Sequence, residues 1–183
     1  MFTDHTLESA PAASRRFMQG TADHLGYLPA ATRRWAASPH LLEGFGKLNV
    51  LFETTTLDPL AREVVILTVA TRNACHLCVA MHTAKLTKLG AAEELISALR
   101  ERRPLADERL DAVRVLTLRI LDTAGAVDDT ALQAFFAHGY TRQHALEIVL
   151  GIGTYTMSTL ANALVQAPVD EQLEPYAWYR HAA

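Results

Sequence analysis

The sequence predicts an all-α protein that folds as a single domain. Helix-forming Ala, Leu, Arg and Glu are abundant along the chain, whereas the alternation of apolar and polar residues that marks β-strands is scarce. The length of 183 residues suits one domain, and 50% of the residues are hydrophobic, which is enough for a real core. Turn and capping residues divide the chain into segments of helical length.

Capping signals define the expected helices in order. Ser38-Pro39 and Asp58-Pro59 each pair an N-cap residue with proline at the first helical position, and Thr141 can cap the last long helix. Apolar periodicity and flanking glycine or proline residues set the remaining boundaries. The expected helices span residues 11–25, a short segment after 29, 39–54, 59–72, 75–90, 91–101, 108–125, 128–139 and 142–166.

Composition and charge argue against several classes of partner. The formal net charge of -3 leaves no basic surface for nucleic acid and no polybasic patch for a membrane. The N-terminal residues carry acids and lack the apolar region of a signal peptide. The longest apolar run, residues 148–165, is interrupted by Gly151, Gly153 and hydroxyl side chains, so it predicts a buried helix. We expect a soluble, cytoplasmic protein that binds neither nucleic acid nor a membrane.

Both cysteines of the chain lie in one short stretch, CHLCVAMH. In a helix that begins near Cys75, the side chains of Cys75, Cys78 and His82 fall within an arc of roughly 60°. His82 is the i+4 neighbour of Cys78, whereas His76 points to another face. Unpaired N–H groups at a helix start stabilise a thiolate, and a nearby histidine can take the proton. The pattern therefore predicts a nucleophilic dithiol.

Disulfide geometry places Cys75 at the edge of that helix. A disulfide needs its Cβ atoms about 3.8 Å apart, but i and i+3 positions of a regular helix are about 5 to 6 Å apart. We expect Asn73 to take the left-handed conformation that ends the preceding helix, with Cys75 in the looser backbone that follows. The pair can then cycle between dithiol and disulfide without unfolding.

Glu63 is the candidate partner for this site. It opens the almost continuously apolar stretch EVVILTVA and is therefore expected to be half-buried. A buried carboxylate needs a partner or becomes a poised acid or base.

Glu63 followed by Cys75-x-x-Cys78-x-x-x-His82 resembles the alkylhydroperoxidase AhpD-like branch of the carboxymuconolactone decarboxylase superfamily. That family pattern has a glutamate on one helix, then CxxC and a histidine four residues further on. Residues 153–170 also resemble the last core helix of the family. The resemblance covers roughly residues 39–170, which leaves 1–38 as an N-terminal helical extension and 171–183 as a C-terminal tail.

The resemblance implies an AhpD-like helical bundle that assembles into homo-oligomers and reduces hydroperoxides without a cofactor. By this analogy Cys78 is the attacking thiol and Cys75 the resolving thiol, with His82 as proton acceptor linked through water to Glu63. A sulfenate formed at Cys78 would condense with Cys75 to a disulfide. A lipoyl- or thioredoxin-like dithiol would then reduce that disulfide by exchange.

The sequence departs from the family pattern at one position, and other interpretations stay open. A histidine directly precedes the second cysteine in that pattern, but here Leu77 does, and the histidine is His76. One alternative is a non-catalytic or redox-sensing helical oligomer. Another is carboxymuconolactone decarboxylase-like chemistry, although that branch typically lacks the CxxC pair. Cys75, Cys78 and His82 are also three potential zinc ligands.

Overall fold

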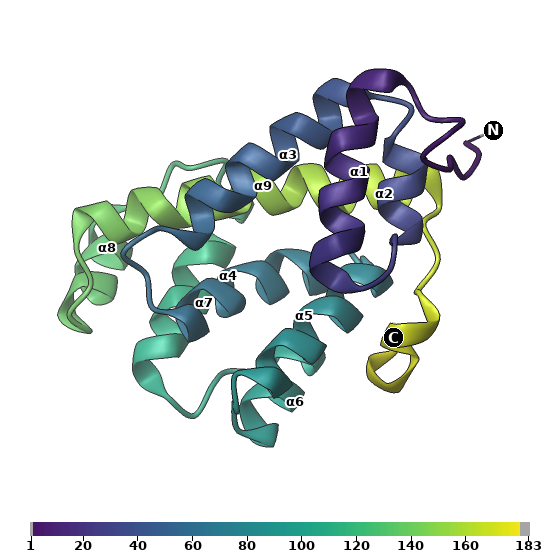
Figure 1. Ribbon diagram of the computed structural model, residues 1–183. Coiled ribbons are helices and arrows are strands. Elements are labelled where there is room, and N and C mark those ends of the chain that lie inside the picture. Colours follow the sequence, from purple (N-terminus) through teal and green to yellow (C-terminus); the bar gives the residue numbers. More distant parts are fainter. Residues whose placement is uncertain (1, 180–183) are drawn as a thin grey trace.

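The computed structural model describes residues 2–179, and within that range the chain forms helices and no β-strand (Figure 1). This confirms the predicted fold class. The elements in chain order are α1 (Ala12–Leu25), α2 (Ala30–Trp35), α3 (Pro39–Glu53), α4 (Pro59–Arg72), α5 (His76–Lys88), α6 (Glu93–Glu101), α7 (Glu108–Asp122), α8 (Asp129–Ala137), α9 (Arg142–Val165) and the 3-10 helix η1 (Glu171–Tyr176).

The helices begin where the capping residues predict. The side chain of Ser38 accepts a hydrogen bond from the backbone N–H of Leu41 at the start of α3. Asp58 accepts from the N–H of Ala61 at the start of α4, with proline at the first helical position in both cases. Thr141 caps α9. These local hydrogen bonds satisfy N–H groups that a helix start would otherwise leave unpaired.

Helix α4 is the centre of the fold. Every residue from Glu63 to Thr71 is buried, as expected for a nearly continuous apolar sequence. α4 packs against α9, α7 and α5, and α9 also packs along α3. Figure 1 shows α8 at one end of this arrangement and α1 and α2 at the other. α5 packs against this central helix and also contacts α6 and η1.

The N-terminal helices pack onto this core. α1 and α2 contact α3, and α2 also contacts α9. A Cβ at Gly46 of α3 would overlap the ring of Phe17, so the absence of a side chain lets α1 approach closely. The Arg34 guanidinium donates a hydrogen bond to the carbonyl of Val165 at 2.9 Å, which ties α2 to the end of α9.

Helix α9 has a buried face and an exposed apolar face. It is 24 residues long and is the one helix within residues 2–179 that is long and apolar enough to cross a membrane. However, 56% of its most apolar window is buried inside the protein, which is typical of a core helix. Its exposed large apolar side chains are Leu146, Val149, Leu160 and Leu164.

Candidate active site

The junction between α4 and α5 places Cys75 outside the regular helix. Cys75 is the N-cap of α5 and has an extended backbone conformation (φ -83°, ψ 93°). The expectation that Asn73 is left-handed is wrong: Asn73 has φ -84°, and Ala74 has φ 52°. Asn73 instead donates its side-chain amide to Thr159 Oγ1 at 2.9 Å, which fixes it against α9. The turn therefore falls one residue later than predicted.

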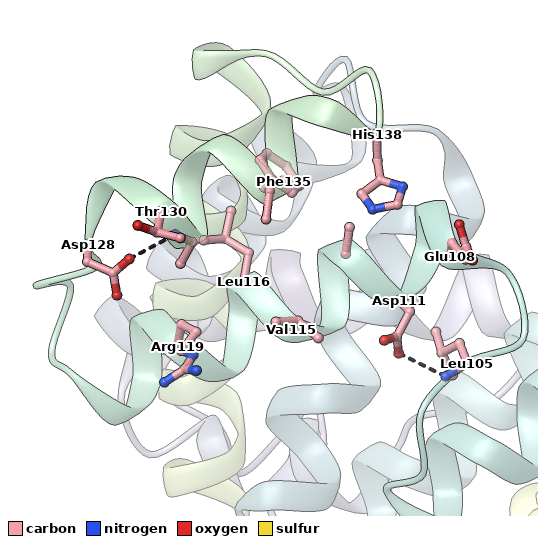
Figure 2. Close-up of a pocket in the computed structure, with 13 residues that line it drawn as sticks. Leu105, Glu108, Asp111, Val115, Leu116, Arg119, Asp128, Thr130, Phe135 and His138 are labelled. Carbon is pink, nitrogen blue, oxygen red and sulfur yellow. Dashed lines mark hydrogen bonds between the residues drawn. The ribbon is translucent and has the colours of Figure 1, made fainter.

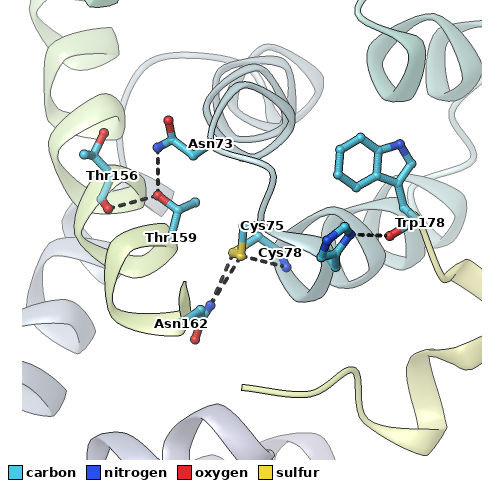
Figure 3. Close-up of a disulfide and its surroundings, with 8 residues drawn as sticks. Asn73, Cys75, Cys78, Thr156, Thr159, Asn162 and Trp178 are labelled. Carbon is cyan, nitrogen blue, oxygen red and sulfur yellow. Dashed lines mark hydrogen bonds between the residues drawn. A yellow bond between two sulfur atoms is a disulfide. The ribbon is translucent and has the colours of Figure 1, made fainter. Parts of the chain in front are cut away.

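Cys75 and Cys78 form a disulfide with their Cα atoms 5.3 Å apart (Figure 3). The side chains are only slightly accessible, at 7% and 5% of their full exposure. The backbone N–H of Cys78 donates to Cys75 Sγ at 3.3 Å. A sulfur atom thus occupies the place that an oxygen takes in an ordinary helix cap, where it receives the positive end of the helix dipole.

His82 lies one turn after Cys78 and is anchored by Glu63. The distance from His82 Nδ1 to Glu63 Oε2 is 2.7 Å, and both side chains are buried. Glu63 is fully buried (0% exposed) rather than half-buried as predicted, because α4 is covered on all sides at this level. A carboxylate that accepts the Nδ1–H of an imidazole leaves Nε2 free to accept a proton.

Lys85 is a member of this network that the sequence analysis missed. Its ammonium nitrogen lies 2.9 Å from Glu63 Oε1 and 2.5 Å from Glu53 Oε1 of α3. Burial raises the pKa of Glu63, but His82 and Lys85 more than offset this and hold the pKa below its usual value. Burial also lowers the pKa of Lys85, and the two carboxylates reverse this, so its pKa is raised. Glu63 is therefore an ionised carboxylate in the interior.

Tyr155 of α9 packs against one side of the His82 ring. The two rings meet edge to face with centroids 5.2 Å apart. The Tyr155 hydroxyl donates to Asn49 Oδ1 at 2.8 Å. Burial raises the pKa of this phenol, and the charge of Glu63 raises it further. Tyr155 therefore stays neutral, and its role at the site is to pack against the imidazole of His82.

Asn162 of α9 contacts the disulfide directly, as Figure 3 shows. Its Nδ2 lies 3.3 Å from Cys78 Sγ and 3.7 Å from Cys75 Sγ. Its Oδ1 is buried and has no hydrogen-bond partner within the described structure. An unpaired buried amide oxygen costs about 1–3 kcal/mol, so Asn162 is not a fully satisfied core amide.

The two histidines of the stretch lie in different surroundings. His76 is exposed, and its Nδ1 lies 2.7 Å from the carbonyl oxygen of Trp178. The same C-terminal segment is held by Arg100, whose guanidinium donates to the carbonyls of Tyr176 and Ala177. η1 and the residues after it therefore pack on α5 and α6. His76 is part of this contact and has no hydrogen bond to Cys75 or Cys78 in residues 2–179.

A partly open hollow of the surface lies away from the cysteine site. This hollow of about 880 Å³ lies between α7 and α8, lined by Leu116, Arg119, Phe135 and His138 among others (Figure 2). None of the residues of the cysteine site lines it. Within residues 2–179 no group of three or more His, Cys, Asp or Glu side chains is arranged to hold a metal ion.

The fold and the cysteine site together define an AhpD-like helical protein with a CxxC pair. Residues 37–118, which include Glu63, Cys75, Cys78 and His82, match the model of the carboxymuconolactone decarboxylase family. This match agrees with the resemblance of the sequence motif to the AhpD-like branch of the carboxymuconolactone decarboxylase superfamily. A comparison with curated proteins found no significant match.

Solved structures share the fold along nearly the whole chain. An alkylhydroperoxidase AhpD core, an uncharacterized peroxidase-related protein from Ralstonia eutropha JMP134, has a TM-score of 0.83 at 17% identity, covering 94% of this chain and 93% of the other. A peroxidase-related protein from Silicibacter sp. TM1040 has a TM-score of 0.78 at 16% identity, covering 97% and 95%. The debrominase Bmp8 has a TM-score of 0.76 at 15% identity, covering 96% and 95%. At these identities the similarity establishes the fold.

Proposed function

We propose that this chain is a thiol-dependent oxidoreductase that reduces hydroperoxides through Cys75 and Cys78. One observation carries the proposal: the two cysteines share a helix start, and one turn later the buried carboxylate of Glu63 holds His82. Two structural neighbours are described as peroxidase-related proteins, which is consistent with this chemistry. The site needs no cofactor, because the sulfur atoms themselves carry the two electrons.

The proposed first step is the attack of the Cys78 thiolate on the terminal oxygen of a hydroperoxide. An S–O bond forms and the O–O bond breaks, so the sulfur is oxidised to a sulfenic acid and the peroxide is reduced to an alcohol. His82 takes the thiol proton beforehand through its free Nε2 and returns it to the departing alkoxide.

The second step is the attack of Cys75 on the sulfenic sulfur of Cys78. The S–S bond forms, the S–O bond breaks, and hydroxide leaves as water with the proton of the second thiol. Two exchange reactions with a lipoyl- or thioredoxin-like dithiol then restore the pair and oxidise the reductant. A reducing compartment such as the cytoplasm supplies such a reductant.

Glu63 supports this cycle by keeping His82 in one tautomer. The Lys85 ammonium, 38% exposed, links the buried carboxylate to Glu53 at the surface. An ionised Glu63 also stabilises the imidazolium that forms when His82 accepts the thiol proton. The network therefore raises the tendency of Cys78 to ionise without Glu63 touching the sulfur.

Thiol counting with an organic hydroperoxide tests the proposal. The reduced protein is mixed with cumene hydroperoxide, and free thiols and the alcohol product are measured with and without dihydrolipoamide. We expect loss of both thiols for each peroxide consumed, and repeated turnover when the dithiol is present. Cys78→Ser should abolish the reaction, and Cys75→Ser should leave a sulfenic acid that dimedone traps. Two thiols that survive millimolar peroxide would overturn the proposal.

The same experiment separates the alternative functions. A redox sensor would lose its thiols without turnover, and its assembly state would follow the oxidation state. A decarboxylase or lactone-processing enzyme would leave both the thiols and the peroxide unchanged.

A further inference from the structure

Asn162 is the group outside the cysteine motif that contacts its sulfur atoms. It lies on α9, 84 residues after Cys78 in sequence, and is only 6% exposed. Its Nδ2–H points at the disulfide, with the shorter distance (3.3 Å) to Cys78 Sγ (Figure 3). A disulfide sulfur is a weak acceptor, whereas a thiolate is a strong one. The hydrogen bond from the Asn162 amide to the sulfur therefore becomes stronger when the cysteine pair is reduced and ionised.

The two cysteines have different donors. Cys75 Sγ accepts the backbone N–H of Cys78 at 3.3 Å and receives the Asn162 amide only at 3.7 Å. Cys78 Sγ has no backbone donor in the described part of the chain, and Asn162 is its side-chain donor. The helix start therefore stabilises a thiolate at Cys75, and Asn162 stabilises one at Cys78.

We infer that Asn162 is a further residue of the reacting site, which donates its amide N–H to the Cys78 thiolate. Its unpaired Oδ1 then remains as an acceptor for the O–H of the sulfenic acid formed on that sulfur. The inference rests on the proposed function in taking Cys78 as the attacking thiol. The hydrogen bond selects Cys78 over Cys75 for that role, because the backbone alone favours Cys75.

Other titratable groups surround the pair without bonding to it. In residues 2–179 none of them has a hydrogen bond to either sulfur. On α5 they are His76, His82 and Lys85, with Glu63 on α4, Arg100 on α6 and Tyr155 on α9. The two glutamates of η1 are exposed. A change at Asn162 alters none of these charges, so a changed ionisation of Cys78 can be assigned to the lost amide.

The test measures the ionisation of one cysteine at a time. Asn162→Leu, which keeps the approximate volume, is made in Cys75→Ser and in Cys78→Ser protein, and the rate of iodoacetamide alkylation is followed against pH. A hydrogen bond to a charged group corresponds to a pKa shift of about one unit or more. We expect Asn162→Leu to raise the pKa of the Cys78 thiol by that amount and to change that of Cys75 less.

Asn73→Ala is the matched control. Asn73 is also an interhelical amide at this junction, but it donates to Thr159 and not to a sulfur, so the pKa of Cys78 should stay unchanged. If Asn162→Leu does not fold, Asn162→Ala replaces it, since alanine also lacks the N–H donor and adds no charge. An unchanged Cys78 pKa, or equal shifts at both cysteines, would overturn the inference.

Alkylation also separates this inference from the proposed function. The measurement needs no peroxide, so a selective pKa shift supports the role of Asn162 even if hydroperoxides leave the thiols intact. Peroxide turnover with an unshifted Cys78 pKa would sink the inference and leave the proposed function standing.

Discussion

Lys85→Met should destabilise the protein because it removes one of two partners from a fully buried carboxylate. Glu63 is 0% exposed and is bonded to His82 and paired with Lys85. Loss of one partner from a fully buried ion pair costs about 3–5 kcal/mol. Lys85 is 38% exposed and His82 remains in place, so water screens the pair and Glu63 keeps one hydrogen bond. We therefore expect a loss of roughly 1–2 kcal/mol in the free energy of unfolding near neutral pH.

The pH dependence of this loss follows from the pKa of Glu63. Its pKa is lower in the folded protein than usual, because His82 and Lys85 outweigh the effect of burial. Such a group stabilises the fold above its unfolded pKa, and the stabilisation is lost as the pH falls through the folded pKa. Once Glu63 is protonated, its carboxyl group no longer carries a charge that Lys85 can pair with. The difference between Lys85→Met and the unmodified protein should therefore shrink in acid.

Urea unfolding followed by circular dichroism measures both effects. Lys88→Met is the matched control, because Lys88 lies on the same helix, is exposed and has no ion pair in the described structure. The reasoning is refuted if Lys85→Met and Lys88→Met have equal free energies of unfolding at neutral pH. It is also refuted if the difference between them grows as the pH falls.

Three further predictions concern packing, assembly and the relay. Gly151→Ala should lower the free energy of unfolding by about 1–3 kcal/mol, because the new Cβ would lie 2.6 Å from two ring atoms of Phe52. At Gly153→Ala the new Cβ would have no atom within 4 Å, so this control should leave the free energy of unfolding unchanged or raise it. Thermal melting of the two variants measures both effects. The expected homo-oligomer would bury the exposed face of α9, so Leu160→Lys should yield smaller species in light scattering, and an unchanged mass would exclude that face. His76→Ala should leave the rate of peroxide-driven thiol loss nearly unchanged, since His76 contacts the C-terminal segment; a large loss of rate would place it in the relay.

Short-range features of the sequence predicted the fold well. N-caps such as Ser38, Asp58 and Thr141 act on N–H groups two or three residues away, so the signal and its effect lie in the same window of sequence. The same holds for Cys75 and Cys78, which share one helix start. The all-α fold follows from such signals repeated along the chain.

Contacts between distant helices could not be predicted in the same way. Lys85 looks like an ordinary cation near a helix C-terminus, and only the packing of α3 and α4 against α5 reveals its two carboxylate partners. Asn162 lies in a long apolar run, and the rotation of α9 about its axis decides that its amide faces the sulfurs. The turn falls at Ala74, and the side chain of the preceding Asn73 is held by α9. Each of these features depends on helix orientation, which sequence periodicity leaves open.

The contact between the rings of Trp178 and His76 gives the protein an optical reporter of its own. Their ring centroids are 5.4 Å apart, and His76 directly follows Cys75. Indole emission is quenched at short range by disulfides, so the fluorescence of Trp178 should respond to the oxidation of the pair. The only other tryptophan, Trp35, is buried in α2 and can be replaced by phenylalanine to isolate the signal. Redox cycling can then be followed in real time without an added label.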